Sequence, residues 1–329
     1  MTGILLSKGT LASYRDGLAA AAREAGLDAR VLHLPDDPKT CFSPEDSASI
    51  EIAYLTRDIR FSEHYRAFGE AVSTASNLKW VHFVSTGVDQ HPFLRNLVER
   101  KVRLTTSAGS NGEPVAQTAI CGLLMLARNF PHWWAAQGRR EWAPLRGDAS
   151  PRDLKGQTVL ILGLGSIGMA VARFCQALGM HVIGVRRSPR RPDDPVQEMH
   201  TLAALPDLLP RCDWVVLACP LTPETRRIVN AGTLARLPRG ARLVNVARGG
   251  VVDEAALLQA LKSGQLGGAY LDVFEKEPLP PDSPLWSLPN VILTPHNASV
   301  SSGNNDRATQ IFFANLVQWA KGAPLQNEV

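Results

Sequence analysis

Short runs of apolar residues alternate with stretches of helical periodicity through most of this 329-residue sequence. Runs that are apolar on both faces are typical of parallel strands with helices packed on each side of the sheet. They form two series, residues 3–7, 29–34, 51–56, 80–85 and 102–106, and then residues 158–163, 181–185, 214–219, 241–247, 268–273 and 290–295. The alternation predicts two doubly wound α/β domains with parallel, Rossmann-like sheets.

Two long helices are expected outside these series. Residues 112–129 have the pattern of a mostly buried helix, and a connector rich in Trp and Arg follows at 132–152. Residues 304–322 have the pattern of a closing helix, in which Phe312, Leu316 and Trp319 share one face. We therefore expect a discontinuous first domain of residues 1–101 and 298–329, a second domain of residues 102–297, and an active site in the cleft between them.

Composition narrows the class of protein. Hydrophobic residues make up 45% of the chain and charged residues 20%, which is an ordinary globular balance. A net charge of +4 without a Lys/Arg block argues against a nucleic-acid partner. The N-terminus lacks the pattern of a secretory signal, and the apolar stretch at 120–127 is too short to span a bilayer. Five cysteines without a C-x-x-C spacing indicate neither a disulfide framework nor a metal site, so we expect a cytoplasmic protein.

The most specific local motif is G-L-G-S-I-G at 163–168, between a predicted strand and a predicted helix. Gly163 permits a tight turn, Gly165 lets the backbone approach a pyrophosphate, and Gly168 allows the helix and strand to pack closely. The N–H groups at the start of the helix would bind the phosphates. A glycine turn that binds nothing is the alternative, but the strand–turn–helix context favours a dinucleotide site.

The residues after the next strand indicate which dinucleotide is bound. An NAD site usually has an acidic residue there to hold the ribose 2′-hydroxyl. This chain instead has Arg186, Arg187 and Ser188. Guanidinium groups bind a 2′-phosphate well, so NADP(H) is the preferred cofactor, with NAD(H) still open. The alternative is that these arginines form only a solvated turn.

Three further segments lie at or just beyond the ends of predicted strands, where doubly wound folds bind ligands. They are VNVARGGVVDE at 244–254, LDVFEKEPLP at 271–280 and LTPHNAS at 293–299. Together with the glycine loop and LTPETRRIV at 221–229, in this order, they make the chain resemble the D-isomer-specific 2-hydroxyacid dehydrogenases, including glyoxylate and hydroxypyruvate reductases. The resemblance extends over essentially the whole sequence.

The resemblance implies catalytic roles for Arg248, Glu277 and His296. Physical chemistry agrees with these roles. A histidine titrates near neutral pH and can protonate a carbonyl oxygen, and a neighbouring carboxylate fixes its tautomer. An arginine fork suits a planar 2-keto acid. Glu275 lies close by in sequence, but Glu277 directly precedes Pro278, as the motif requires.

The resemblance also implies further contacts with the cofactor and the substrate. Besides the three glycines and Arg186, Arg187 and Ser188, the expected cofactor contacts are Ser166, Ile167, Cys219, Pro220, Thr225, Val246, Ala247, Arg248, Asp272 and His296. Asp272 matches the position that meets the nicotinamide carboxamide. STGVD at 85–89 resembles the loop that binds the substrate carboxylate, with Ser85, Thr86 and Gly87 joining Arg248 and His296. An ordinary turn is the alternative for this loop.

The expected reaction is reduction of a small 2-keto acid, of the glyoxylate or hydroxypyruvate type, to the D-2-hydroxy acid. The apolar Phe83 argues weakly against a phosphorylated substrate. Two alternatives stay open: a dehydrogenase of the same family for a larger or phosphorylated acid, and a corepressor-like protein that binds the dinucleotide for assembly.

Residues 131–142 carry three tryptophans and two arginines, residue types that are enriched at interfaces. We therefore expect a homodimer formed through the second domain and this arm. The resemblance to glyoxylate-reducing relatives implies that Trp142 reaches toward the partner's substrate cleft. The alternative is that the rings pack beneath their own loop.

Overall fold

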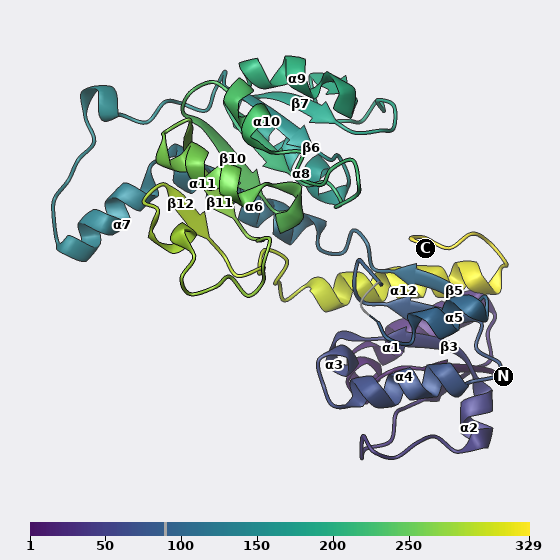
Figure 1. Cartoon of the computed structure of the whole chain (residues 1–329). Helices are drawn as coiled ribbons and strands as arrows, with labels where there is room; N and C mark the ends of the chain where they lie inside the picture. The colour runs from purple at the N-terminus through teal and green to yellow at the C-terminus, as the bar shows by residue number, and fades with distance from the viewer. Residues whose placement is uncertain (89–90) are drawn as a thin grey trace. The chain divides into compact units, whose positions relative to one another are not determined.

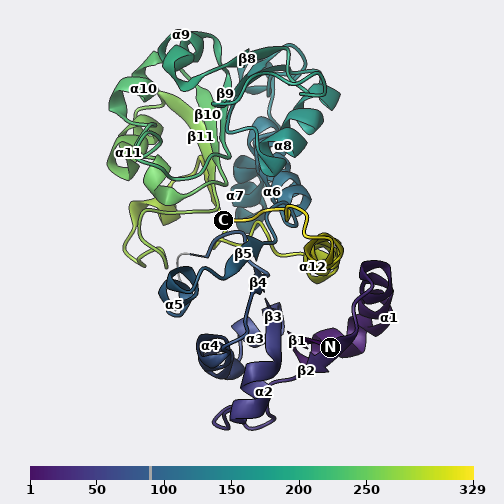
Figure 2. The same cartoon turned by 90° about the vertical axis from the view of Figure 1, so that its right-hand side faces the viewer.

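In the computed structural model, which describes residues 1–88 and 91–329, the chain forms two compact units (Figures 1 and 2). The first unit contains Met1–Ser110 and Ser302–Val329, and the second contains Asn111–Ser301. The predicted boundary at 101–102 is too early, because the strand Arg103–Thr106 pairs within the first sheet. The predicted return at 298 is also early, since the chain up to Ser301 stays with the second unit.

The first unit is a parallel sheet flanked by helices. Its strands are Thr2–Leu5 (β1), Ala29–Leu32 (β2), Ile50–Leu55 (β3), Trp80–Phe83 (β4) and Arg103–Thr106 (β5). Its helices are Lys8–Ala25 (α1), Pro44–Ser49 (α2), Arg57–Arg60 (α3), His64–Thr74 (α4), Leu94–Glu99 (α5) and Asn304–Ala320 (α12). Within the described residues the strand order is β2-β1-β3-β4-β5, so the order reverses at β1.

Alternation along the strands divides the core of this unit between the two faces of the sheet. Ile52 of β3 and Trp80 of β4 pack with α1 and α12 on one face, whereas Ala53 and Val81 pack with α4 and α5 on the other. Phe312 of α12 is fully buried and stacks on Trp80, with ring centroids 5.3 Å apart. The last helix of the chain therefore completes the core of the first unit.

The second unit has a larger parallel sheet. Its strands are Thr158–Leu162 (β6), His181–Val185 (β7), Glu198–His200 (β8), Trp214–Leu217 (β9), Ala241–Asn245 (β10), Leu266–Leu271 (β11) and Val291–Leu293 (β12). Its α-helices are Gly112–Ala127 (α6), Phe130–Arg139 (α7), Ser166–Ala177 (α8), Leu205–Leu208 (α9), Ala231–Arg236 (α10) and Glu254–Lys262 (α11). Short 3₁₀ turns span Gly147–Ala149 (η1), Leu202–Ala204 (η2), Leu209–Arg211 (η3), Gly249–Val251 (η4) and Pro284–Ser287 (η5).

The strand order of this sheet, within the described part of the chain, is β12-β11-β10-β9-β6-β7-β8. Helices α6 and α8 cover one face, and α9, α10 and α11 cover the other (Figure 1). Gly122 of α6 packs against the ring of Tyr270 so closely that a Cβ atom would lie 2.3 Å from it. The two helix-covered faces explain why the strands are apolar on both sides.

The predicted fold class is confirmed, and the differences lie in small elements. The edge strand β8 was not predicted, since its three residues are only half-buried and give no clear pattern. The connector predicted at 132–152 is wrong in its first part, which belongs to helix α7. None of the helices in the described ranges is both long and apolar enough to cross a membrane.

Candidate active site

The predicted catalytic histidine and glutamate are in contact. His296 Nδ1 lies 2.7 Å from Glu277 Oε2, and the N–H of Phe274 donates to the other carboxylate oxygen at 3.0 Å. Because an ionised carboxylate only accepts, this geometry assigns the donating N–H of the imidazole to Nδ1. Nε2 has no hydrogen-bond partner among the described residues, and the side chain is 47% exposed. The ring is therefore held on one side and available for proton transfer on the other.

The loop that carries His296 is organised by Asp272. The N–H of His296 donates to the Asp272 carbonyl at 2.8 Å, which holds His296 at a φ of 52°. The buried Asp272 carboxylate accepts from the Thr294 hydroxyl at 2.6 Å and from the N–H groups of Asn297 and Ala298. These contacts make Asp272 a positioning residue for His296. Its expected contact with the nicotinamide stays a prediction.

Arg248 lies at the same edge of the sheet. It follows β10, Glu277 follows β11 and His296 follows β12, and these three strands are neighbours. A Cβ atom on Gly249 would lie 1.9 Å from the backbone of Phe274, so only glycine permits this approach of the two loops. The exposed Arg248 guanidinium donates from Nη1 to the Ala247 carbonyl at 2.7 Å. The three predicted catalytic residues thus come from adjacent loops.

An open pocket lies beside the His296–Glu277 pair. Its volume is about 600 Å³, and its walls are mainly apolar. They are formed by Phe274, Glu277, Pro278, Leu279, Trp286, Leu293, Thr294, Pro295 and His296. No Lys or Arg lines this pocket in the part of the chain that the structure describes.

The glycine loop fits a dinucleotide. A Cβ atom on Gly163 would lie 2.6 Å from the Cys219 N–H nitrogen, and one on Gly168 would lie 1.9 Å from the Gly163 carbonyl oxygen. These two glycines are required for packing. Gly165 instead faces open space and starts α8 without a side-chain cap. The first N–H groups of α8, on Ser166 and Ile167, are thus placed to bind a pyrophosphate.

The family model for the NAD-binding domain of D-isomer specific 2-hydroxyacid dehydrogenases matches residues 120–298, more than half of the chain. The chain belongs to this family.

Similar members of the dehydrogenase family carry different names. A glyoxylate reductase of Korarchaeum cryptofilum is 36% identical over 257 residues, which cover 77% of this chain and 76% of that protein. A D-3-phosphoglycerate dehydrogenase of Archaeoglobus fulgidus is 33% identical over 79% of this chain, which spans about half (49%) of that longer protein. The crystal structure of an NADPH-dependent glyoxylate/hydroxypyruvate reductase from Sinorhizobium meliloti, with NADP and sulfate, aligns with a TM-score of 0.72 at 29% identity, covering 100% of this chain and 98% of that one.

Other predicted cofactor residues of this dehydrogenase line the same edge, at the ends of β9 and β10. Cys219 is buried against Gly163, and Val246 and Ala247 are buried beyond β10. The Thr225 hydroxyl donates to the Pro220 carbonyl at 2.6 Å and accepts from the Thr222 N–H at 2.8 Å. Thr225 therefore shapes its own turn, and its contact with a cofactor is untested.

The arginines after β7 differ from one another. Arg186 is almost fully buried in an ion pair with Asp194, whereas Arg187 and Ser188 are exposed. The alternative of a solvated turn is therefore wrong for Arg186. Sequence reasoning missed Asp194, because it lies in a polar run, 190–194, that has the pattern of a surface loop.

The predicted substrate loop lies in the first unit of the dehydrogenase, after β4. The Ser85 hydroxyl donates to the Gly87 carbonyl at 2.8 Å, and Thr86 is exposed. A side chain on Gly87 would meet no atom within 4 Å. Asp89, the last residue of the predicted motif, lies outside the described residues. The role of this loop in binding substrate stays a prediction.

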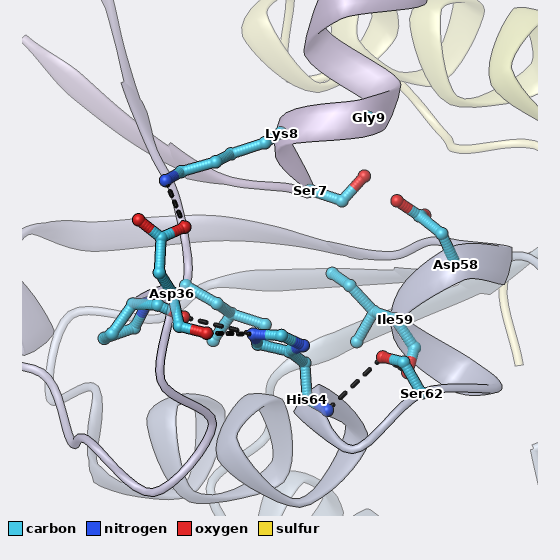
Figure 3. Close-up of a pocket in the computed structure, with 10 residues that line it drawn as sticks. Ser7, Lys8, Gly9, Asp36, Asp58, Ile59, Ser62 and His64 are labelled. Atoms are coloured by element: carbon cyan, nitrogen blue, oxygen red, sulfur yellow. Dashed lines mark hydrogen bonds and ion pairs between the residues drawn. The ribbon is translucent and has the colours of Figure 1, made fainter.

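A second pocket, of about 250 Å³, lies where the strand order of the first sheet reverses (Figure 3). Its ionisable side chains already have hydrogen-bond partners, and Asp58 accepts from the Thr56 hydroxyl. Lys8 pairs with Asp36 at 2.5 Å, and His64 Nε2 lies 3.2 Å from the carbonyl oxygens of Pro35 and Asp36. None of the predicted site residues lines this pocket, so it is not part of the candidate active site.

Proposed function

We propose that this chain is an NADP(H)-preferring reductase that converts a small 2-keto acid, glyoxylate or hydroxypyruvate, into the D-2-hydroxy acid. The observation that carries the proposal is the His296–Glu277 pair, which lies on the same sheet edge as the glycine loop and Arg248. The names of the Korarchaeum and Sinorhizobium relatives support the substrate class.

Each residue of this site has a chemical role in the proposal. The nicotinamide, when bound, supplies a hydride to the carbonyl carbon. His296 Nε2 donates a proton to the carbonyl oxygen, so that the imidazolium becomes neutral and is reprotonated from water. Glu277 stabilises the imidazolium through Nδ1 and prevents the ring from turning. Arg248 binds the carboxylate of the keto acid and stabilises negative charge on the carbonyl oxygen.

The pocket beside His296 favours an unphosphorylated substrate. A phosphate group carries up to two negative charges and is usually bound by Arg or Lys. The described lining of this pocket holds no basic side chain other than His296. We therefore prefer glyoxylate or hydroxypyruvate to the phosphorylated acid named for the Archaeoglobus relative.

We also propose the cytoplasm as the compartment of this enzyme. The five cysteines are free thiols, and Cys175, Cys212 and Cys219 are buried. Burial raises the pKa of the Cys175 thiol to about 12, which keeps the thiol protonated and unreactive. A reducing compartment suits such a set of cysteines.

Three substitutions test the proposed chemistry. We expect His296→Asn to lower kcat for glyoxylate reduction by at least roughly a hundredfold, the usual scale for losing a general acid. Glu277→Gln should lower kcat by a smaller factor, since the His296 ring keeps a hydrogen-bond partner at position 277 but loses the negative charge of that partner. Glu275→Gln is the matched control, because Glu275 pairs with Arg227 at 3.2 Å and not with His296.

The measurement is steady-state NADPH oxidation with glyoxylate, hydroxypyruvate and phosphohydroxypyruvate. NADPH affinity should be the same in all three variants, as read by quenching of tryptophan fluorescence. Near-normal kcat in His296→Asn would refute the assignment of the proton donor. A preference for phosphohydroxypyruvate in the unmodified enzyme would refute the proposed substrate class.

A further inference from the structure

The loop that follows β4 is held differently at its two ends. At the first end, the N–H of Ser107, just beyond β5, donates to the carbonyls of Phe83 and Ser85 at 2.9 and 3.1 Å. At the other end, the N–H of His91 donates to the Val88 carbonyl at 3.1 Å. In the described part of the chain, Val88 receives no hydrogen bond from the sheet. The second half of the loop therefore depends on how His91 itself is held.

The His91 ring is buried among aromatic rings of the first unit and is only 4% exposed. Its centroid lies 4.9 Å from that of Phe83 and 5.4 Å from that of Phe93, with interplanar angles of 29° and 25°. Its Nδ1 lies 2.7 Å from the hydroxyl oxygen of Tyr65, in the first turn of α4. The ring thus joins the end of the loop to the end of β4 and to the start of α4.

One ring nitrogen of His91 is left unsatisfied. Nε2 is buried and has no hydrogen-bond partner among the described residues. Burial, with a smaller contribution from the charge of Arg60, lowers the pKa of His91 to about 4, so the ring is neutral at pH 7. A neutral imidazole has one donor and one acceptor nitrogen. Whichever nitrogen carries the proton, the unpartnered one costs free energy of folding.

A phenylalanine at position 91 would avoid this cost. Its ring would stack on Phe83 and Phe93 in the same way, and the half-buried Tyr65 hydroxyl would bond to water instead. Stability alone therefore does not account for a histidine in this stack. A buried polar group that is kept at a cost in stability is typical of a functional position.

We propose that His91, held by Tyr65, is a positioning residue that fixes the backbone N–H groups of the predicted substrate loop for the carboxylate of the keto acid. The inference rests on the proposed function and on the predicted role of residues 85–87 in it. Backbone N–H groups bind an anion well only when the chain is held in the right conformation. His91 holds the chain through its own N–H on Val88, and the Tyr65 hydroxyl prevents its ring from turning.

This role predicts a specific change in the kinetics. The carboxylate of the keto acid does not react, so contacts with it are about equally strong in the substrate complex and in the transition state. A loosened loop weakens both states equally, which raises KM and leaves kcat nearly unchanged. Loss of the proton donor His296 lowers kcat instead, so the two roles are distinguished by the same measurement.

The first variant is His91→Phe. We expect KM for glyoxylate and for hydroxypyruvate to rise at least about fivefold, while kcat and NADPH affinity stay within about twofold. The Tm should equal that of the unmodified enzyme or exceed it, because no ring nitrogen is buried without a partner. A residue that served only the packing of the core would show the opposite result, a lower Tm with unchanged KM.

Tyr65→Phe tests the hydrogen bond itself. It removes one hydroxyl and leaves His91 Nδ1 without a partner, so KM should rise as in His91→Phe while Tm falls. Tyr65→Phe/His91→Phe should raise KM no further than either single variant, since both remove the same bond. Hydrogen exchange of the amides of residues 85–88 should be faster in all three variants. The control is Tyr54→Phe, which removes a buried hydroxyl on the opposite face of the sheet and should leave KM unchanged.

The outcomes separate this inference from the proposed function. An unmodified enzyme that reduces neither glyoxylate nor hydroxypyruvate would overturn the proposed function and this inference with it. An active enzyme whose KM is unchanged in a folded His91→Phe variant would overturn only the role of His91. Increases in KM that add up in the double variant would overturn the role of the hydrogen bond with Tyr65.

Discussion

Single residues at the ends of three neighbouring strands determine the geometry of the site. Asp272 accepts hydrogen bonds from one side chain and two backbone N–H groups, and its own carbonyl receives the N–H of His296. Tyr270 extends this network, with its hydroxyl 2.6 Å from the Thr294 hydroxyl. A non-glycine residue at positive φ, such as His296, keeps this conformation only if the surrounding contacts enforce it.

We predict that Asp272→Asn disturbs this network although it changes no atom of His296. The amide nitrogen that replaces Oδ2 would face the N–H of Ala298, which is itself a donor. The expected loss is about 1–3 kcal/mol in the free energy of unfolding, because buried donors lose their acceptor. The kcat should fall at least about tenfold, since the imidazole is no longer aligned.

The matched control for this prediction is Asp253→Ala, which removes the N-cap that Asp253 provides to the Ala256 N–H. Its thermal stability should fall while kcat stays near normal. Urea unfolding and steady-state kinetics on both variants test whether Asp272 positions His296. A kcat of Asp272→Asn equal to that of the unmodified enzyme would contradict the positioning role.

Among single residues, the sequence predicted those site residues that occupy a defined position in a motif. His296 and Glu277 were predicted from ordered motifs, and the structure brings them to 2.7 Å. Asp194 and the network of Asp272 could not be predicted, because each depends on which backbone groups the folded loops bring together. A run of charged residues such as 190–194 looks the same whether its carboxylate is solvated or buried.

Among the elements, helix α7 stands out by its exposed rings. Phe130, Trp133 and Trp134 are between 36% and 45% exposed, and Phe130 contacts both tryptophans at centroid distances of 5.5 and 5.8 Å. Trp142, just beyond the helix, is 96% exposed. Contiguous exposed apolar surface of this kind marks protein interaction sites.

We predict that α7 and the arm after it form a homodimer interface. Sedimentation at micromolar concentration should give twice the mass of the 35.7 kDa chain. The double variant Trp133→Ser/Trp134→Ser should dissociate at concentrations where the unmodified enzyme is dimeric, because aromatic anchors dominate binding energy. The control is Trp286→Ser, whose ring is 56% exposed on η5, apart from α7 in the sequence. A monomeric unmodified enzyme would contradict this prediction.

Long elements were better predicted than short ones. The helix expected at 112–129 is α6, Gly112–Ala127, and the helix expected at 304–322 is α12, Asn304–Ala320. Apolar periodicity over several turns made both visible. Helix α7 was missed because three of its ten residues are aromatic and it buries only Ala136, so it lacks a core-facing stripe.

On the scale of the whole molecule, the two units differ in which of their groups have shifted pKa values: buried histidines in the first unit and a glutamate in the second. His82 of β4 is fully buried in the first unit, with its ring nitrogens 2.7 Å from the Thr105 hydroxyl and 3.0 Å from the Ser107 hydroxyl. Burial lowers the pKa of His82 to about 3, and that of His91 to about 4. In the second unit, Arg211 lowers the pKa of Glu198 to about 2.

We predict that the first unit loses stability at higher pH than the second. The unfolded chain protonates His82 below about pH 6.5 while the folded unit does not, so stability is present above that pH and falls as pH drops toward 3. Between pH 7 and 4.5 the loss from His82 is roughly 2–3 kcal/mol. Glu198 contributes stability above its ordinary pKa near 4.5, and this is lost only below that pH.

Urea unfolding at pH 7, 6, 5 and 4.5, followed by hydrogen exchange to distinguish the units, measures this effect. His82→Gln should flatten the pH dependence of the free energy of unfolding of the first unit, whether or not the substitution changes that free energy at pH 7. His181→Gln in the second unit is the control, and it should leave the pH dependence of the first unit's free energy of unfolding unchanged. A first unit whose stability is constant from pH 7 to 4.5 would contradict the prediction.

The discontinuity of the first unit has a consequence for biosynthesis. Phe312 and Leu316 of α12 complete the face of the sheet that carries Trp80, yet they leave the ribosome after all of the second unit, which ends at Ser301. One face of the sheet β1 to β5 therefore stays only partly covered, by α1, while the second unit, Asn111–Ser301, is translated. Because domains generally fold as units, we expect the second unit to reach its native state first in the growing chain, contrary to the usual order from the N-terminus. We therefore expect chaperones to bind the nascent first unit during that interval, until the last helix is released.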